Sequence, residues 1–357
     1  MTAQELDRAR VEAFAGQMLG ILNGAGLALM TSIGHQTGLF DAMAVLPPST
    51  SQQIAAAAGL RERYVREWLG AMVTGCVIDY DPANGMYTLP PEHAAWLTRS
   101  AGPQNMAAIT QRISMLGRVE EGIIESFRKG GGVPHSAYPG FQRQMAELST
   151  PGYDARLIRV SLPAIPGLVQ RLQADIDVAD VGCGSGHAIN LMAQAFPNSR
   201  FTGYDISEEG VAAGREEAVR LGLTNVRFEA RDVANLNVPG RFDLVTAFDV
   251  IHDLAQPSRA LKEIAEALRP NGTFLMVDIG ASSELHDNLL HPMGPFLYAN
   301  STMRCMTTSL AENGEGLGTM WGEQKALQML AGAGFTRVEV KRVPGDNVNN
   351  YYVASKG

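Results

Sequence analysis

The stretch DVADVGCGSGHAIN, residues 177–190, decides the fold of this chain. A short apolar, β-prone run leads into a loop that carries Gly182, Gly184 and Gly186, and a helical segment follows. Glycine lets a backbone approach a ligand closely at the N-terminus of a helix. A strand that passes through such a loop into a helix is typical of nucleotide-binding α/β folds, several of which share it.

Two details of the loop narrow the class of ligand. The spacing is GxGxG, and His187 stands where a dinucleotide-binding loop would place its third glycine. Asp180 precedes Gly182 by two residues, inside the predicted strand. A carboxylate beside the loop works against a pyrophosphate and favours a ligand with an ammonium or sulfonium cation.

From residue 175 onward, short β-prone runs alternate with helical segments. This alternation predicts a parallel, doubly wound α/β sheet. The predicted strands are 177–182, 200–205, 225–232, 242–250, 272–278, 336–343 and 350–356, and the predicted helices are 187–196, 208–222, 258–268 and 322–334. The stretch RPNG, residues 269–272, is predicted to end the third of these helices and to turn the chain.

Two more acids end the next predicted strands. Asp205 ends the second strand and Asp232 the third. A carboxylate in the position of Asp205 can accept both ribose hydroxyls, as the comparable acid does in dinucleotide folds. Asp232 can accept a hydrogen bond from an adenine amino group. Three acids at three successive strand ends fit an adenosyl ligand that has no phosphates.

With these features, residues 175–357 resemble a class I S-adenosylmethionine-dependent methyltransferase. The matched motifs are DVGCGSG, the strand-end Asp205, RD at 231–232, FDLV at 242–245 and LRPNG at 268–272. The resemblance implies a Rossmann-like sheet of seven strands with the last strand antiparallel, and S-adenosylmethionine as cofactor. It implies these cofactor-binding residues: Asp180, Gly182, Gly184, Ser185, Gly186, Asp205, Ile206, Asp232, Val233 and Phe248.

The stretch FDVIHDLAQP, residues 248–257, follows the fourth predicted strand, so His252 is expected near the methyl group of the cofactor. The region resembles the HDW segment of small-molecule O-methyltransferases, which implies that His252 is the catalytic base and that Asp278 orients it. The tryptophan of HDW is Leu254 here, and the second acid of that family has no assured match, with Glu284 or Glu315 possible. Asp253 is expected to be a loop or cap residue, because neighbouring side chains diverge. A histidine that only shapes the pocket is the alternative.

Residues 1–100 contain a helix, turn, helix and hairpin pattern that is typical of a winged helix. Thr50 and Gln53 form a capping box, and Asn84-Gly85 marks the hairpin. The resembling O-methyltransferases carry such a domain for dimerisation, so a homodimer is expected. DNA binding is disfavoured, because the arginines of RERYVRE, residues 61–67, are offset by glutamates. Residues 101–174 are predicted to form a helical linker or lid.

An insertion at 279–320, with residues just after it, is the predicted substrate region. Its apolar candidates suggest a roomy pocket for a small hydrophobic or aromatic acceptor, because methionine adapts to irregular apolar shapes. Inter-domain core or a dimer contact is the alternative for each residue. The candidates are Met293, Phe296, Tyr298, Met303, Met306 and Trp321.

Composition limits the partners, the compartment and the functions that remain open for this chain. The 357 residues carry a net charge of −8, which disfavours nucleic acid and anionic membranes as general partners. Three widely spaced cysteines suggest a reducing compartment and no metal cluster. No signal peptide is recognised, and the apolar stretch 21–34 is expected to be too broken and too short to span a membrane. A cytoplasmic, metal-independent O-methyltransferase is expected. The alternatives are an N- or C-methyltransferase and a cofactor-sensing transcription regulator.

Overall fold

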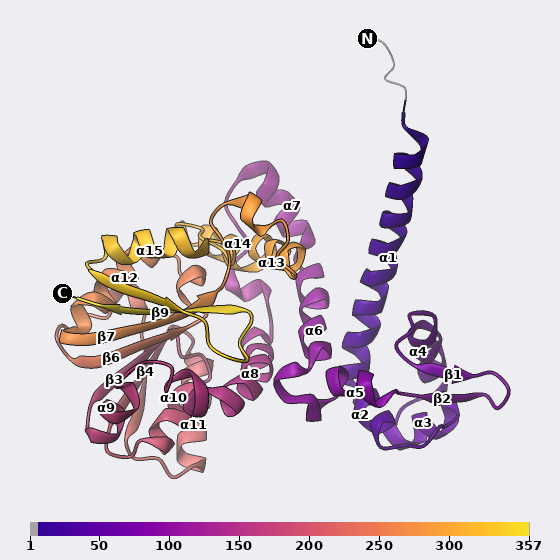
Figure 1. Cartoon of the computed structure of the whole chain (residues 1–357), viewed down its shortest axis with the longest axis horizontal. Helices are drawn as coiled ribbons and strands as arrows, with labels where there is room; N and C mark the ends of the chain where they lie inside the picture. The colour runs from indigo at the N-terminus through magenta and orange to yellow at the C-terminus, as the bar shows by residue number, and fades with distance from the viewer. Residues whose placement is uncertain (1–5, 357) are drawn as a thin grey trace. The chain divides into compact units, whose positions relative to one another are not determined.

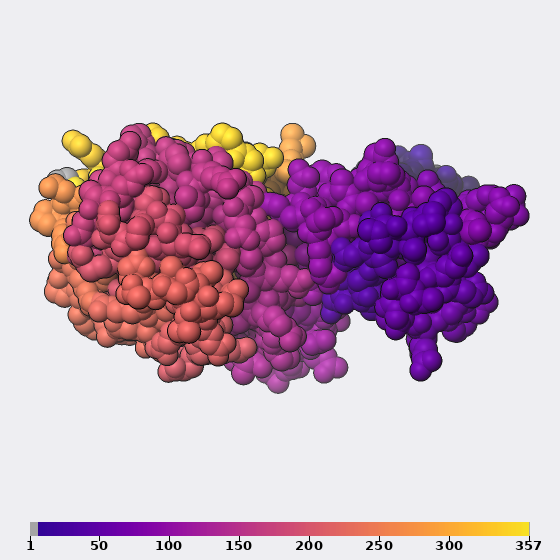
Figure 2. All heavy atoms as spheres, turned by 90° about the horizontal axis from the view of Figure 1, so that it is seen from below, coloured from indigo at the N-terminus to yellow at the C-terminus, as the bar shows by residue number. Residues whose placement is uncertain are grey.

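The computed structural model describes residues 6–356. The chain divides into two compact units, Met1–Gly117 and Arg118–Gly357. The first unit is coloured indigo to violet and the second violet to yellow (Figure 1; Figure 2). The boundary between the two units falls inside the predicted helical segment 101–174. The predicted domain limits after residues 100 and 174 stay predictions.

The first unit contains the winged-helix pattern that the sequence predicts. Thr50 and Gln53 make the capping box, and Gly85 takes the left-handed backbone of the hairpin turn at φ 66°. The elements are α1 (Arg8–Gln36), α2 (Leu39–Ala44), α3 (Ser51–Ala58), α4 (Glu62–Thr74), the antiparallel pair β1 (Asp79–Asp81) and β2 (Met86–Thr88), α5 (Pro91–Leu97), the 3₁₀ helix η1 (Arg99–Gln104) and α6 (Met106–Gly117).

The core of this unit forms around Trp68. Its ring meets the edge of Phe40 at 5.3 Å between centroids, and its indole N–H donates to the carbonyl of Met30 at 2.8 Å. The amphipathic stripe of α4, which includes Leu69 and Met72, is fully buried beside it. The apolar face of α4 therefore packs into the core of the first unit.

Helix α1 corrects one expectation. The stretch 21–34 was expected to be broken by Asn23 and its glycines, but it belongs to one continuous helix of 29 residues. The backbone hydrogen bonds of a helix tolerate single glycines at a cost of about 1 kcal/mol each, so these positions do not end it. By length and composition alone, α1 is long and apolar enough to cross a membrane. The most apolar 18 residues of this helix are not buried inside the structure.

The second unit begins with helices and continues into the sheet. The helical part comprises α7 (Glu120–Lys129), the 3₁₀ turn η2 (His135–Ala137), α8 (Phe141–Gly152), the π-helix η3 (Tyr153–Ser161) and α9 (Leu168–Ala174). Between the later strands lie α10 (His187–Ala195), α11 (Glu208–Arg220), η4 (Val233–Asn235), η5 (Ile251–Asp253), α12 (Pro257–Ala267), η6 (Leu285–Asn288), α13 (Gly294–Asn300), the π-helix η7 (Ser301–Cys305), α14 (Met306–Ala311) and α15 (Gly322–Gly332).

The sheet confirms the predicted fold class. Its seven strands lie in the order β5-β4-β3-β6-β7-β9-β8, and β9 runs antiparallel to both of its neighbours. Helices cover both faces (Figure 1). The strands are β3 (Asp177–Val181), β4 (Arg200–Asp205), β5 (Val226–Ala230), β6 (Phe242–Phe248), β7 (Leu268–Ile279), β8 (Arg337–Lys341) and β9 (Asn349–Ser355).

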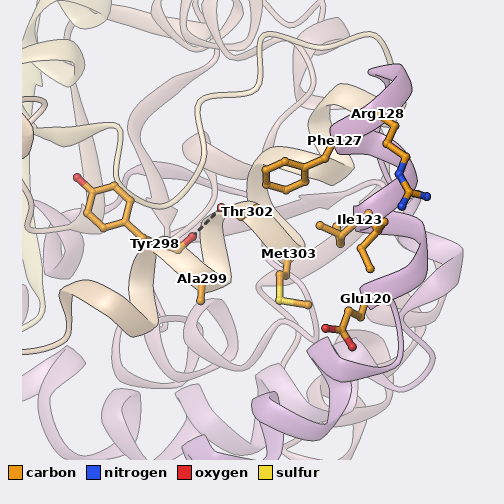
Figure 3. Close-up of a pocket in the computed structure, with 9 residues that line it drawn as sticks. Glu120, Ile123, Phe127, Arg128, Tyr298, Ala299, Thr302 and Met303 are labelled. Carbon is orange, nitrogen blue, oxygen red and sulfur yellow. Dashed lines mark hydrogen bonds between the residues drawn. The ribbon is translucent and has the colours of Figure 1, made fainter. Parts of the chain in front are cut away.

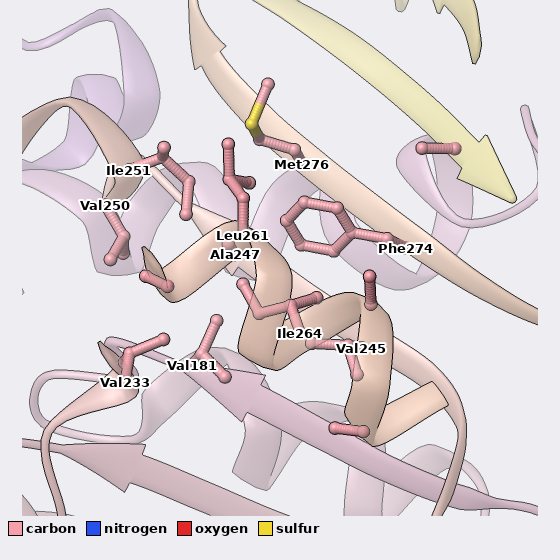
Figure 4. Close-up of a cluster of buried hydrophobic side chains, with 14 of the residues drawn as sticks. Val181, Val233, Val245, Ala247, Val250, Ile251, Leu261, Ile264, Phe274 and Met276 are labelled. Atoms are coloured by element: carbon pink, nitrogen blue, oxygen red, sulfur yellow. The ribbon is translucent and has the colours of Figure 1, made fainter. Parts of the chain in front are cut away.

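Two hydrophobic cores hold the sheet, one on each face. On one face, Leu261 and Ile264 of α12 pack against Val245 and Phe274 of the central strands (Figure 4). On the other face, α9, α10 and α11 cover the sheet with side chains such as Leu172. The central strands are thus buried on both sides, as a parallel sheet requires.

The stretch RPNG differs from its prediction. Helix α12 ends at Ala267, and β7 begins directly at Leu268 rather than after the turn. Leu268 pairs with Phe242, but the next pair joins Thr273 to Leu244, so residues 269–272 bulge out of the ladder. Residues 269–272 therefore form a turn inside β7, because Leu268 before them already pairs with Phe242.

Gly186 gives a test of the loop that starts α10. Its φ is +74°, and an added Cβ would lie 2.4 Å from the ring of Phe228. We expect Gly186→Ala to lower the free energy of unfolding by about 2–5 kcal/mol, because a left-handed alanine costs about 1–2 kcal/mol and overpacking about 1–3 kcal/mol. Urea denaturation measures the change.

The matched control is Gly222→Ala. Gly222 has φ +68°, but an added Cβ would meet nothing within 4 Å. This variant should lose only the backbone cost of about 1–2 kcal/mol. Equal losses in the two variants would contradict the close packing of Gly186 on Phe228.

Candidate active site

The glycine loop after β3 is held to the end of β4. Gly182, Gly184 and Gly186 all have positive φ, between 53° and 74°. The N–H of Gly184 donates to Oδ2 of Asp205 at 2.7 Å, and the N–H of Ser207 donates to Oδ1 at 2.8 Å. The predicted ribose acid therefore also fixes the loop, and each of its oxygens keeps a second lone pair for a ligand hydroxyl.

Asp180 lies within the sheet beside this loop. Its Oδ1 accepts a hydrogen bond from the hydroxyl of Thr246 on β6 at 2.6 Å. Burial raises the pKa of Asp180 to about 7; the Thr246 hydrogen bond opposes this, and the negative charge of Asp205 adds to it. Burial likewise raises the pKa of Asp205. Among the described residues neither carboxylate forms an ion pair with a lysine or arginine, so the site favours a cationic group.

The other predicted cofactor residues occupy the same edge of the sheet. Asp232 caps η4 by accepting from the N–H of Ala234 at 2.9 Å, and its second oxygen accepts from the amide of Asn235. Val233 is buried in the core and Ile206 is exposed. Ser185 is half-buried within the loop. Their contacts with a cofactor stay predictions.

Phe248 at the end of β6 has an aromatic neighbour that the sequence did not predict. Tyr153, the first residue of η3, meets its ring edge-on at 5.6 Å between centroids. Burial raises the pKa of Tyr153 well above its ordinary value, so the phenol stays protonated. Phe248 is thus packed under the helical segment instead of standing free at the strand end.

His187 joins this helical segment to the glycine loop. Its Nε2 lies 2.9 Å from Asp154 of η3, and its Nδ1 lies 2.9 Å from Glu217 of α11. His187, which replaces the third glycine of a dinucleotide-binding loop, therefore stabilises the packing of neighbouring helices. It connects α10 to a helix on each side.

His252 and Asp278 form a buried pair, as the resemblance implies. Nδ1 of His252 lies 2.7 Å from Oδ1 of Asp278, which also accepts from the backbone N–H of Ile279 at 2.8 Å. Asp278 is fully buried and His252 is 5% exposed. The parallel strands β6 and β7 bring them together, because both strands end at the edge that carries the glycine loop.

Asp253 corrects the expectation that it would point away from His252. Its Oδ1 lies 3.4 Å from Nε2 of His252. Both residues belong to the 3₁₀ turn η5, and Asp253 also lies near the buried Arg304 of η7, whose positive charge attracts its carboxylate. The acid that faces Nε2 is therefore Asp253. Glu284 is exposed, and Glu315 instead accepts from Ser258 at the start of α12.

These carboxylates change the protonation of His252. Burial lowers the pKa of the imidazole, but the charges of Asp278 and Asp253 outweigh burial and raise the pKa well above its ordinary value. Sγ of Cys305 lies within 4.8 Å of a ring nitrogen of His252 and of a carboxylate oxygen of Asp253. Cys305 on η7 is a residue of the site that no motif or spacing in the sequence indicates.

The predicted substrate residues fall into several places. Tyr298 and Met303 line a groove of about 520 Å³ between α7 and the helices α13 and η7, opposite Ile123 and Phe127 (Figure 3). Met293 and Phe296 pack on a small separate cluster, Met306 is half-buried at the start of α14, and Trp321 is buried in the main core. Their roles as substrate contacts stay predictions.

The protonation of Asp180 can be tested through stability. Because the folded pKa of about 7 lies above the usual 3.8, the folded chain holds this proton more tightly than the unfolded chain. Its stabilising effect is complete below pH 3.8 and is lost as the pH rises through 7. Asp180→Asn cannot titrate, so between pH 5 and pH 8 it should gain about 2–3 kcal/mol relative to the native chain.

Thermal or urea unfolding of both proteins at several pH values measures this gain. The matched control is Asp232→Asn, which removes the acid that caps η4; it was predicted to end the third strand, but β5 already ends at Ala230. Parallel stability curves for native protein and Asp180→Asn would contradict the buried, protonated state of Asp180.

Comparisons with known proteins identify a family for each of two parts of the chain. Residues 25–99 match the family of Rv2258c-like winged HTH domains, and residues 172–334 match a methyltransferase domain family. The chain is 36% identical over 115 residues to a trans-aconitate 2-methyltransferase of Deinococcus radiodurans, covering 32% of this chain and 40% of that protein. It is 34% identical over 110 residues to a fatty-acid O-methyltransferase of Mycolicibacterium smegmatis, covering 30% and 39%. The chain thus spans about two fifths of these curated relatives.

Solved structures share the fold over nearly the whole chain. The mitomycin 7-O-methyltransferase MmcR aligns with a TM-score of 0.73 at 19% identity, over 98% of this chain and 100% of that one. Human N-acetylserotonin methyltransferase in complex with its cofactor SAM aligns with a TM-score of 0.70 at 17% identity, over the whole of both chains. The resemblance drawn from the sequence is therefore confirmed: this chain carries an Rv2258c-like winged helix-turn-helix domain followed by a methyltransferase domain.

Proposed function

We propose that this chain is an S-adenosylmethionine-dependent O-methyltransferase that acts on a small, apolar acceptor. The observation that carries the proposal is the buried His252–Asp278 pair at the sheet edge that also carries the glycine loop. A base beside a methyl donor is what transfer to a hydroxyl oxygen needs, since the oxygen must lose its proton as it attacks.

The residues around the glycine loop fit the cofactor. Buried Asp180 and Asp205 form no ion pair with a described lysine or arginine, which suits a cationic ligand and disfavours a pyrophosphate. When bound, S-adenosylmethionine supplies an activated methyl group. Asp205 would hold the ribose hydroxyls, Asp232 the adenine and Phe248 the methionine part.

In this proposal Asp278 keeps His252 in one tautomer. Its carboxylate accepts from Nδ1–H, which leaves Nε2 as the atom that receives the proton of the acceptor hydroxyl. The neutral imidazole is the active form, so the proton held by the Asp278 and Asp253 charges must leave before each methyl transfer. Proximity and alignment of the acceptor supply most of the remaining acceleration.

An apolar acceptor is supported by the groove of Figure 3. Its walls are Ile123, Ile124 and Phe127 of α7 and Ala299 and Met303 opposite them. The groove adjoins η7, the π-helix that also carries Cys305 beside His252. The name of the fatty-acid O-methyltransferase relative is in keeping with an apolar acceptor.

For the winged-helix domain we propose dimerisation and not DNA binding, in a cytoplasmic protein. The arginines of α4 are neutralised on their own helix, where Arg63 pairs with Glu67 and Arg66 with Glu62. In contrast, α1 exposes large apolar side chains that include Phe14, a composition that favours a protein partner over phosphate. A second copy of α1 is the proposed occupant of this face.

Removing the base tests the reaction. With radiolabelled cofactor and a panel of small phenols and hydroxylated polycyclic aromatics, His252→Gln should reduce turnover at least about a hundredfold while cofactor affinity is unchanged. Asp278→Asn should reduce it at least about tenfold, because the tautomer is no longer fixed. The control is His286→Gln, a histidine with a 75% exposed side chain. Undiminished turnover of His252→Gln would favour an N-, C- or carboxylate-methyltransferase.

The exposed face of α1 gives a second test. Ile21 and Leu22 are 55% and 69% exposed, so replacing both by glutamate should leave the fold intact and convert a dimer to a monomer in light scattering. Val219→Glu, on the 80% exposed residue of α11, is the matched control and should stay dimeric. A native monomer, or native protein that floats with lipid vesicles, would contradict pairing through α1.

A further inference from the structure

The face of His252 that points away from Asp278 carries two more side chains able to bind a metal. Nε2 of His252, a carboxylate oxygen of Asp253 and Sγ of Cys305 all lie within 4.8 Å of one another. The first two atoms are 3.4 Å apart. Ligand bonds of about 2.0–2.3 Å around a tetrahedral Zn²⁺ set neighbouring ligand atoms about 3.3–3.8 Å apart, so a small inward shift of the thiol closes the set.

We propose that His252, Asp253 and Cys305 form a zinc-binding site that competes with the proton-accepting role of His252. The donor set is one imidazole, one carboxylate and one thiolate, the ligand types that zinc prefers. Three protein ligands leave a fourth position open, as in catalytic zinc sites and unlike closed structural ones. The site therefore goes beyond the proposed methyl transfer, because zinc acts here as an inhibitory ligand.

Surrounding contacts already hold the ligands as a metal site requires. Asp278 accepts from Nδ1 of His252 at 2.7 Å, which directs the lone pair of Nε2 toward Asp253 and Cys305. A carboxylate behind a zinc-bound histidine is a recurrent arrangement in zinc proteins. The amide of Asn300 donates to Sγ of Cys305 at 3.4 Å and so helps to hold the sulfur in place.

Charge and burial are also in keeping with a cation at this point. Asp253, Asp278 and a Cys305 thiolate would contribute three negative charges, and the neighbouring buried Arg304 one positive charge. A divalent cation brings the sum to zero. Because His252 and Cys305 are almost completely buried, an ion bound between them would be shielded from bulk water.

Direct metal titration of the full chain tests the site without cofactor or acceptor. Calorimetry with Zn²⁺ should give one ion per chain, and Co²⁺ should give a thiolate-to-metal charge-transfer band. Cys305→Ser should abolish this band and weaken zinc binding at least about tenfold, and Asp253→Asn should weaken it while keeping the band. The matched control Cys76→Ser removes an exposed thiol of the first unit and should change neither.

A native protein without the band, or a band that survives Cys305→Ser, would overturn the proposal. As a second readout, zinc should slow methyl transfer by the native enzyme, and a chelator should restore it. Failure of the zinc site can be distinguished from failure of the proposed methyl transfer. Zinc binding is measured without cofactor or acceptor, and methyl transfer is measured in chelator, without zinc.

Discussion

The hydrogen bond between His252 and Asp278 is the interaction on which the proposed chemistry depends. The two residues are 26 positions apart, and only the parallel pairing of β6 with β7 brings them within 2.7 Å. Helix α12 packs on the two strands, and Asp278 on β7 is completely buried. A buried carboxylate is costly unless it is paired, so the fold and the orientation of the imidazole stabilise each other.

The acids of the same sheet edge have different physical states. Burial raises the pKa of Asp180 to about 7, whereas Asp205 is surrounded by backbone N–H donors that lower its pKa against the larger effect of burial. Asp232 is a helix cap. One edge thus combines a carboxyl whose ionised form a cationic ligand would stabilise, a preorganised acceptor of hydroxyl groups, and a base held by a carboxylate.

Much of this arrangement follows from sequence, and the misses have definite causes. The strand ends, the positive-φ glycines and the Asp278 partner were predictable, because β-strand periodicity, glycine spacing and a family motif are local signals. Asp253 was misjudged because its direction depends on tertiary contacts of η5 with η7, such as the nearby Arg304, which no spacing reveals. Cys305 and Tyr153 were missed because tertiary packing alone brings η7 and η3 to the site. The substrate residues depend on insertion packing in the same way.

The most direct measurement of the central claim is the tautomer of His252, read from ¹⁵N NMR of histidine-labelled protein bound to demethylated cofactor, with His252→Gln assigning the signal. Once the imidazole is neutral, the account predicts a protonated Nδ1, donating to Asp278, and an unprotonated Nε2 that is free to take a proton. A neutral imidazole protonated at Nε2 would contradict it, because the atom facing the acceptor could then not serve as a base.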